Sequence, residues 1–335
     1  MNQGPGPETD RARSPGRWGI KTARRNAVAL ATDARLFPAA AFAASRLVAL
    51  NDRADTDVIV FSDAAVADLA TSVGLPFSTR GLSVAAGSNL SPHYLRFFIP
   101  EALPSYDRIL YLDTDTYAED ARLFRLFDLD MGEHVFAGVR DAVIAFVPGS
   151  DELSSILGPG NTRYMNSGVM LIEAARYRRE RTLRDILKRT RGKQRGFHLD
   201  QSALNLTLRG NFLELSPAFN LMTPLWNSFV RKAIAPAIVH FTGVMKPWRG
   251  PSFLLDHPAR SEMEKYFPTS PWPGFLPGFF GLREALAQSP QQVAPSFDAP
   301  FGGKPEFLAY LRATDFADVS AGLTVVRFDR LPDAG

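Results

Sequence analysis

Two aspartates on either side of a threonine, Asp113 and Asp115, directly follow an apolar run at Arg108–Leu112. Such a run is typical of a buried strand. Carboxylates at positions i and i+2 after a strand can converge on one hard divalent cation, and the loop beyond leaves that cation open to a phosphate. A D-x-D triplet is a weak signal by itself, because any long chain contains a few by chance. The triplet therefore needs support from a second segment.

The second segment is V-H-F-T-G-V-M-K-P-W at 239–248. It offers the imidazole of His240, a glycine turn at Gly243 and the ammonium group of Lys246. An imidazole adds a metal ligand, a lysine meets phosphate as a point charge, and glycine lets the backbone approach closely. His240 alone would more often be a hydrogen-bonded core histidine, and Lys246 alone a solvated lysine. Together with the aspartates, the segment predicts a site for a metal-bound diphosphate.

The sequence predicts alternating strands and helices over the first 140 residues, and these elements must position the candidate site residues. This order favours βαβ units and a mostly parallel sheet, whose ligands bind at the carboxyl ends of the strands. Asp33 and the aspartate pair both fall at such ends. No G-x-G-x-x-G follows the first strand and no P-loop occurs, so an ordinary dinucleotide or ATPase site is excluded. Predicted strands lie at 27–32, 57–61, 108–112, 134–139, 168–172 and 236–241, and 174–190 is predicted to be one strongly basic helix.

Composition limits the remaining classes. The chain has 335 residues, 45% of them hydrophobic, which allows one large α/β domain or two smaller ones. The lack of cysteine excludes disulfides, thiol nucleophiles and Cys-based zinc sites. A net charge of +3 does not favour a nucleic-acid partner. Neither a secretory signal nor a run of 18 apolar residues is present, so no transmembrane segment is expected. We expect a cytoplasmic protein, either free or peripheral to the inner face of a membrane.

Several sequence blocks occur in an order that resembles a known family. The blocks are A-T-D at 31–33, H-Y-L-R at 93–96, R-I-L-Y-L-D-T-D at 108–115, Y-M-N-S-G-V-M-L-I at 164–172, H-L-D-Q at 198–201 and H-F-T-G-V-M-K-P-W at 240–248. Over residues 27–249 the chain resembles the retaining glycosyltransferases of family 8, which include glycogenin and the bacterial lipopolysaccharide galactosyl- and glucosyltransferases. The resemblance implies the GT-A fold, an α/β fold with a mostly parallel central sheet flanked by helices. It also implies a UDP-sugar donor and a Mn²⁺ or Mg²⁺ ion.

The resemblance also assigns roles to residues. The metal ligands would be Asp113, Asp115 and His240, and the catalytic pair Asp200 and Gln201. Gln201 would lie near the anomeric carbon, but an amide is a poor nucleophile. Attack on the same face as the leaving phosphate is therefore favoured, with Asp200 kept as a minor candidate nucleophile. The donor-binding residues would be Thr32, Asp33, Tyr94, Arg96, Thr114, Asp141, Asn166, Ser167, Gly243 and Lys246.

The predicted organisation has a disordered arm at 1–25, the catalytic domain at 26–255 and an extension at 256–335. The extension contains a Pro/Gly-rich linker and, at 266–280, an aromatic and proline-rich stretch. Aromatic faces stack on sugar rings, so we predict that this stretch, with Trp272 and Phe275, borders an acceptor cleft. Packing without a ligand role and association with a membrane interface are the alternative interpretations of this stretch.

The predicted reaction moves galactose or glucose from a UDP-sugar to a glycan, a lipid-linked acceptor or a small hydroxyl compound. Two other functions stay open. One is a catalytically weak scaffold that binds nucleotide-sugar or glycan. The other is a haloacid-dehalogenase-type phosphatase, which also places D-x-D after an apolar strand. In that class a threonine or valine stands two places later, where this chain has Tyr117.

Overall fold

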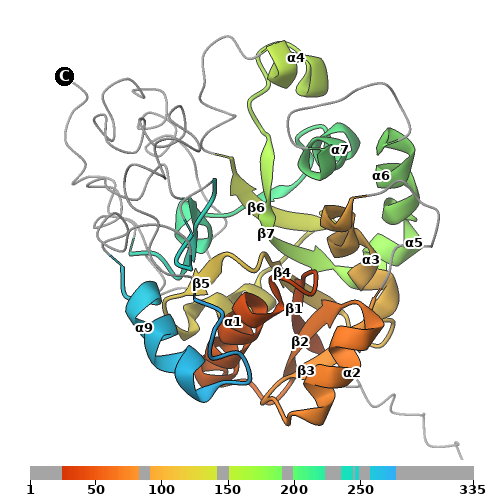
Figure 1. The fold of residues 1–335 in the computed structure, drawn as a ribbon. Helices are drawn as coiled ribbons and strands as arrows, with labels where there is room; N and C mark the ends of the chain where they lie inside the picture. The colour runs from red at the N-terminus through yellow and green to blue at the C-terminus, as the bar shows by residue number, and fades with distance from the viewer. Residues whose placement is uncertain are drawn as a thin grey trace, which may run out of the picture.

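The computed structural model describes residues 25–82, 91–141, 151–190, 199–222, 235–243, 246–248 and 257–276. Strands and helices alternate along these residues, and helices lie on both sides of a large sheet (Figure 1). The predicted α/β class with a mostly parallel sheet is confirmed. The helices are α1 (Phe37–Leu50), α2 (Ala64–Ser72), α3 (Leu95–Ala102), α4 (Asp151–Leu157), α5 (Ala174–Arg179), α6 (Thr182–Thr190), α7 (Leu199–Leu208) and α9 (Ala259–Tyr266).

The large sheet has the strand order β3-β2-β1-β4-β7-β6-β8 in the described part of the chain. Strands β3, β2, β1 and β4 run parallel, as do β6 and β8. Strand β7 runs antiparallel to both of its neighbours, β4 and β6. Its first residues therefore lie beside the carboxyl ends of β4 and β6. The bounds are β1 (Asn26–Ala31), β2 (Thr56–Ser62), β3 (Ser78–Gly81), β4 (Arg108–Leu112), β6 (Phe136–Arg140), β7 (Met165–Glu173) and β8 (Leu213–Glu214).

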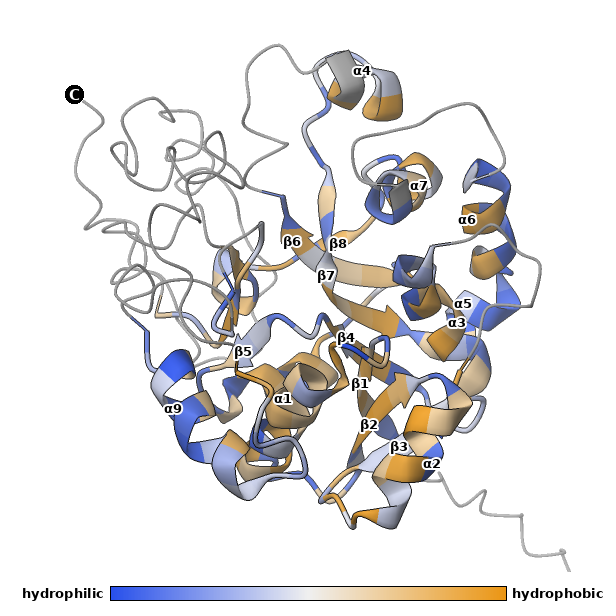
Figure 2. Cartoon of the chain, in the orientation of Figure 1, coloured by the Kyte–Doolittle hydropathy of each residue, from blue (hydrophilic) through white to orange (hydrophobic). Residues whose placement is uncertain are grey.

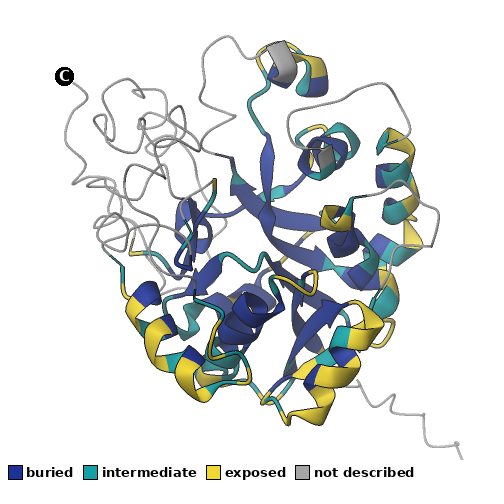
Figure 3. Ribbon diagram, in the orientation of Figure 1, coloured by how far each residue is buried: buried dark blue, intermediate teal, exposed yellow. Residues whose placement is uncertain are grey.

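Both faces of the central strands are covered, which explains the apolar runs of β1, β2 and β4. Leu110 and Leu112 of β4 belong to the core cluster shared with α1, whereas Ile109 and Tyr111 belong to the cluster shared with Phe97 of α3. Strands β1, β2 and β4 are mostly hydrophobic in Figure 2 and buried in Figure 3, whereas the edge strand β3 is largely exposed. The sheet is thus a rigid support for the loops at its carboxyl edge.

A second, smaller sheet brings a late segment of the chain to the end of β4. His240 is the antiparallel partner of Thr116, and the N–H of Phe241 donates to the Asp115 carbonyl at 2.9 Å. This pairing fixes His240 beside the loop that carries the D-x-D triplet. The strand order is β5-β10-β9, with bounds Thr116–Ala118, Ile238–His240 and Leu221–Met222.

The basic segment 174–190 forms two helices, so the prediction of one helix is wrong. Helix α5 ends at Arg179 and α6 begins at Thr182. Between them Arg181 has a φ of 57°, a left-handed conformation that cannot continue a right-handed helix. The break turns the second half of the segment in a new direction (Figure 1).

Residues 257–276 pack on α1. Ala259, Met263 and Phe267 share a core cluster with Phe42, and short 3-10 turns lie at Pro92–Tyr94, Ala121–Asp128, Pro217–Phe219 and Phe267–Thr269. Apart from Arg25, the predicted arm lies outside the described residues, as do the linker and all of 277–335. The proposed division into domains stays a prediction. Among the described helices, none has the length and apolar character needed to cross a membrane.

Candidate active site

The loop after β4 holds Asp113 and Asp115 in one closed turn. Thr116 closes it, because its N–H and its Oγ1 both donate to the Asp113 carbonyl, at 3.1 and 2.8 Å. The N–H of Asp113 donates to the Gly168 carbonyl at 2.8 Å, and the Tyr111 hydroxyl donates to Asp113 Oδ1 at 2.6 Å. The turn is therefore tied to β7 and to the underlying core.

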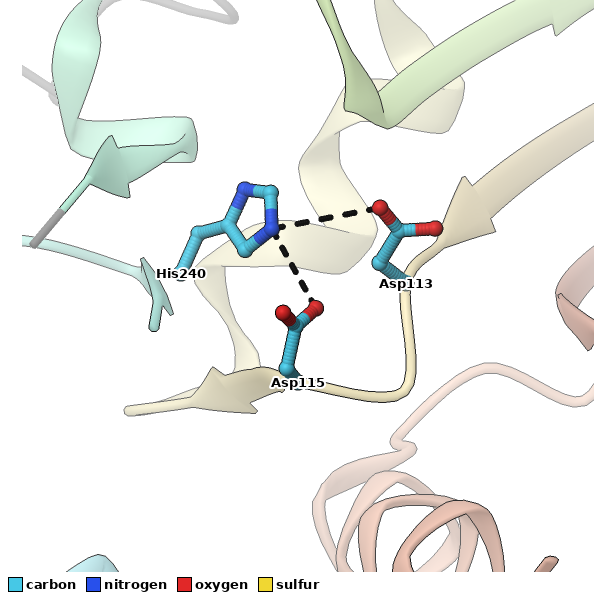
Figure 4. A group of neighbouring side chains, drawn as sticks. All are labelled: Asp113, Asp115 and His240. Atoms are coloured by element: carbon cyan, nitrogen blue, oxygen red, sulfur yellow. Dashed lines mark ion pairs between the residues drawn. The ribbon is translucent and has the colours of Figure 1, made fainter. Parts of the chain in front are cut away.

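His240 faces both carboxylates (Figure 4). Its Nε2 lies 3.2 Å from Asp115 Oδ1 and 3.9 Å from Asp113 Oδ2. One ligand atom from each of the three residues lies within 4.8 Å of the others. Two carboxylate oxygens and one imidazole nitrogen suit Mn²⁺, and Mg²⁺ would use mainly the oxygens. The structure thus brings the three predicted metal ligands together in a group that fits one divalent cation.

A glycine makes this approach feasible. A Cβ atom on Gly168 would lie 2.1 Å from Cε1 of His240 and 2.9 Å from Oδ2 of Asp113, closer than real Cβ atoms come to other atoms. Only a residue without a side chain lets β7 pass so near the imidazole. The glycine of the N-S-G block is therefore part of the geometry of the candidate metal site.

A lysine forms an ion pair with one of the two carboxylates. Lys246 forms an ion pair with Asp115 Oδ2 and donates to the Phe241 carbonyl. Burial opposes the charge of Asp115, but Lys246 and His240 outweigh it and hold the pKa of this carboxyl well below its usual range. Asp115 is therefore an anion at neutral pH, and the Lys246 ammonium group lies beside the candidate metal site.

Arg96 of α3 joins the metal group to the D-Q pair. Its Nη2 lies 3.0 Å from Asp113 Oδ1 and its Nε 3.3 Å from Asp200 Oδ2. Its Nη1 donates to the Oγ and the carbonyl of Ser167, both at 3.0 Å. Burial disfavours the charge of Arg96, but these carboxylates raise its pKa above the ordinary value. A fixed positive charge thus lies between Asp113 and Asp200.

The predicted sugar-side residues contact one another directly. Gln201 of α7 accepts from the N–H of Ser167 at 2.9 Å and donates through Nε2 to Asp141 Oδ2 at 3.1 Å. Asn166 donates through Nδ2 to the same oxygen at 2.9 Å. Asp141 follows β6 and Asn166 is the second residue of β7, so the antiparallel pairing of these strands brings the two residues together. The Gln201 amide is held in one orientation by these partners.

The remaining predicted donor residues lie around this group. Thr32 and Asp33 follow β1, and Asp33 Oδ1 accepts from the N–H of Leu36 at 2.9 Å, which orders the turn into α1. Thr114 is half-buried between the two aspartates. The structure places these residues at the carboxyl edge of the sheet, and their contacts with a donor stay predictions.

Tyr94 and Gly243 are the last two predicted donor residues. Burial, together with the charge of Asp200, raises the pKa of the Tyr94 hydroxyl to about 12, so this group is a neutral donor. Gly243 is exposed and has a φ of +76°, which a side chain would strain. Its neighbours Val244 and Met245, and His198 of the H-L-D-Q block, lie outside the described residues.

Sequence reasoning missed two residues that support the ligands. Tyr111 holds Asp113 through its hydroxyl, and Asn220 lies 3.0 Å from His240 Nδ1 through its Oδ1. A signal for Asn220 existed, because a lone amide between Phe219 and Leu221 must find partners if the segment is buried. Tyr111 carries no such signal, since tyrosine is common in core strands.

Comparison with known proteins identifies the family of this chain and several relatives. The model of Glycosyl transferase family 8 matches residues 85–251. General stress protein A of Bacillus subtilis (strain 168) is 29% identical over 198 residues, which are 53% of this chain and 65% of that protein. Glycosyltransferase GlyF of Streptococcus pneumoniae serotype 4 is 28% identical over 162 residues, or 46% of this chain and 37% of that protein. The chain thus covers about two-thirds or less of these relatives.

Solved structures share the fold. A crystal structure of the galactosyltransferase LgtC, in complex with donor and acceptor sugar analogs, superposes with a TM-score of 0.61 at 23% identity. The match covers 75% of this chain and 100% of that one. Glycosyltransferase GlyE of Streptococcus pneumoniae TIGR4 has a TM-score of 0.56 at 20% identity, covering 80% of this chain and 64% of that one. The fold is of the GT-A type, and the chain is a member of glycosyl transferase family 8.

Proposed function

We propose that this chain transfers galactose or glucose from a UDP-sugar to a hydroxyl group, with retention of configuration and with Mn²⁺ or Mg²⁺. The observation that carries the proposal is the convergence of Asp113, Asp115 and His240 at the end of β4, beside the Lys246 ammonium group. Family membership supports a nucleotide-sugar donor. It also argues against the phosphatase alternative, in which an aspartate of the D-x-D triplet would be the nucleophile.

The donor would bind across the carboxyl edge of the sheet. Thr32 and Asp33 after β1 would contact the uridine, and Lys246 would move from Asp115 to a diphosphate oxygen. A bound cation would neutralise the charge that develops on the leaving diphosphate. Arg96 would add a positive charge on the side of the sugar, because it lies between Asp113 and Asp200.

The transfer step would then proceed on one face of the sugar. The bond from the anomeric carbon to the diphosphate oxygen breaks, a bond to the acceptor hydroxyl forms, and the hydroxyl proton passes to the leaving phosphate oxygen. Gln201 would orient the sugar rather than attack it, because its carbonyl oxygen already accepts from Ser167. Asp200 would bind sugar hydroxyls and stays a minor candidate nucleophile.

The proposal includes more than one class of acceptor and a cellular location. A glycan, a lipid-linked acceptor or a small hydroxyl compound all fit the proposal. A cytoplasmic location, and peripheral contact with the inner face of a membrane, are predictions based on the sequence alone.

Turnover of purified nucleotide-sugars tests the proposal and separates it from a binding scaffold. The protein should release UDP slowly from UDP-galactose or UDP-glucose when Mn²⁺ is present. Asp115→Asn should lower this rate by about a hundredfold or more, since a metal ion contributes several kcal/mol of charge stabilisation. ADP-glucose is the control for the base. No release from any UDP-sugar with Mn²⁺, or equal release from ADP-glucose, would overturn the proposal.

A further inference from the structure

A row of buried amides connects Asp141 to His240. Asn166 Nδ2 lies 2.9 Å from Asp141 Oδ2, and Asn220 Nδ2 lies 2.9 Å from Asn166 Oδ1. Asn220 Oδ1 in turn lies 3.0 Å from His240 Nδ1. All four residues are at most 5% exposed. Buried polar groups that all contact one another form a network whose orientation is set as a unit.

In each hydrogen bond of this row, the donor and the acceptor can be assigned from neighbouring groups that can only donate or only accept. The backbone N–H of Gly168 lies 3.0 Å from Asn166 Oδ1 and can only donate. The opposite end of the Asn166 amide must then be the NH₂ group, which donates to Asp141. Asn166 Oδ1 also accepts from Asn220 Nδ2, so the other end of the Asn220 amide is its oxygen. A carbonyl oxygen can only accept, and it therefore requires a proton on His240 Nδ1.

This orientation matters at the other ring nitrogen. A neutral imidazole with its proton on Nδ1 carries a lone pair on Nε2, the atom that faces Asp115 and Asp113. The opposite tautomer would place an N–H toward the carboxylates, where Asp115 could accept it and no lone pair would be left for a cation. Partners on the second nitrogen commonly select the tautomer of a metal-binding histidine.

We infer that Asn220 is a positioning residue that keeps a proton on His240 Nδ1, so that Nε2 is the ring nitrogen available to a cation at the aspartates. Asn166 and the Gly168 backbone fix the amide of Asn220, so residues assigned to the sugar also set the state of a metal ligand. This inference deepens the proposed function and rests on it for the metal. The ring state itself can be measured without any metal or donor.

The first experiment measures the protonation of the His240 ring nitrogens by long-range ¹H–¹⁵N correlation NMR on the metal-free protein. The signals of His240 are identified among the five histidines by their loss in His240→Gln. We expect Nδ1 to carry a proton in the unaltered protein. An unprotonated Nδ1 would overturn the inference and leave the proposed transferase function untouched.

Two variants of nearly equal size separate the two contacts of Asn220. Asn220→Leu removes both the acceptor for His240 and the donor for Asn166, whereas Asn220→Asp keeps the acceptor alone. We expect the leucine variant to lose the Nδ1 proton to Nε2 and the aspartate variant to keep it. Mn²⁺ alone, measured by electron paramagnetic resonance of the free ion, should bind about 10- to 100-fold more weakly to the leucine variant. The aspartate variant should bind it more tightly than the leucine variant does.

The outcomes are distinguishable. If the leucine variant keeps a protonated Nδ1 and binds Mn²⁺ like the unaltered protein, Asn220 does not position the ring. If the unaltered protein has the expected ring state but does not bind Mn²⁺ even with UDP present, the proposed function fails while the selection of the tautomer stands. If the leucine variant does not fold, the ring state of the unaltered protein still decides the inference.

Discussion

Replacing Gly168 with alanine should destroy the metal site while leaving the sheet in place. The new Cβ atom would lie 2.1 Å from Cε1 of His240, and real Cβ atoms essentially never come closer than 3.0 Å to another atom. The imidazole must therefore retreat by about 0.9 Å, the difference between these values. The strand is held on the β4 side, because Val169 pairs with Leu112 and the Gly168 carbonyl accepts from the N–H of Asp113, so the imidazole is the group expected to move. A metal ligand tolerates only about 0.2 Å of displacement.

The expected loss follows from this mismatch. A displacement of about 1 Å at a reacting centre can cost roughly a hundredfold in rate. We therefore expect Gly168→Ala to lower UDP-sugar turnover, and the affinity for Mn²⁺ with UDP, by about a hundredfold or more. Isothermal titration and a coupled assay for UDP release measure the two quantities.

Two controls make the test specific. Gly138→Ala adds the same methyl group on the neighbouring strand β6, where it would meet the flexible end of Met165, so Mn²⁺ binding should be retained. In a His240→Ala background the main clash is gone, and Gly168→Ala should then lower the melting temperature less than it does in the unaltered chain. Wild-type Mn²⁺ affinity in Gly168→Ala would refute the reasoning.

Three further predictions concern the donor and the acceptor. Lys246→Met should weaken the binding of UDP with Mn²⁺ by about tenfold, because a charged contact to phosphate is lost. Mn²⁺ alone should bind no more weakly, since Asp115 loses its lysine partner and becomes available to the ion. Titrations with and without UDP measure both affinities, and an unchanged UDP affinity would contradict the prediction. Gln201→Ala should lower turnover more than UDP affinity, because Gln201 is predicted to lie beside the sugar and not beside the diphosphate. Equal losses in turnover and in UDP affinity would argue against that position. Trp272→Ala combined with Phe275→Ala should reduce transfer to an acceptor and preserve hydrolysis of the UDP-sugar, and chromatography of the products measures both rates. If neither rate changes, the stretch 266–280 has only a packing role.

The sequence was sufficient to predict that Asp113, Asp115 and His240 come together, and to predict the sheet that supports them. The apolar run before Asp113 has the length of a strand, and carboxylates after such a strand lie at its carboxyl end whatever the rest of the fold is. His240 and Lys246 could be predicted as site residues only because they occur in one short segment together with Gly243. The structure places His240 and Lys246 on the carboxylates, as this combination predicted.

Other features depend on contacts that no local pattern encodes. An apolar run such as that of β7 reads the same in both directions, so its antiparallel course was not predictable, yet this course brings Asn166 and Gly168 to Asp113. The pairing of β10 with β5 in a separate sheet joins segments far apart in the chain. Arg181 breaks the basic helix through a backbone conformation that arginine adopts rarely. The role inferred for Asn220 needed the three-dimensional position of its two partners.

The central claim is that Asp113, Asp115 and His240 bind a divalent cation together with a uridine diphosphate. The most direct test is the melting temperature of the protein with UDP, measured with and without Mn²⁺. A ligand that binds only the folded state raises the melting temperature by an amount that grows with the ratio of its free concentration to its Kd. The account predicts a rise with UDP only when Mn²⁺ is present, and loss of most of that rise in His240→Ala. An equal rise with UDP in excess chelator, or an undiminished rise in His240→Ala, would contradict it.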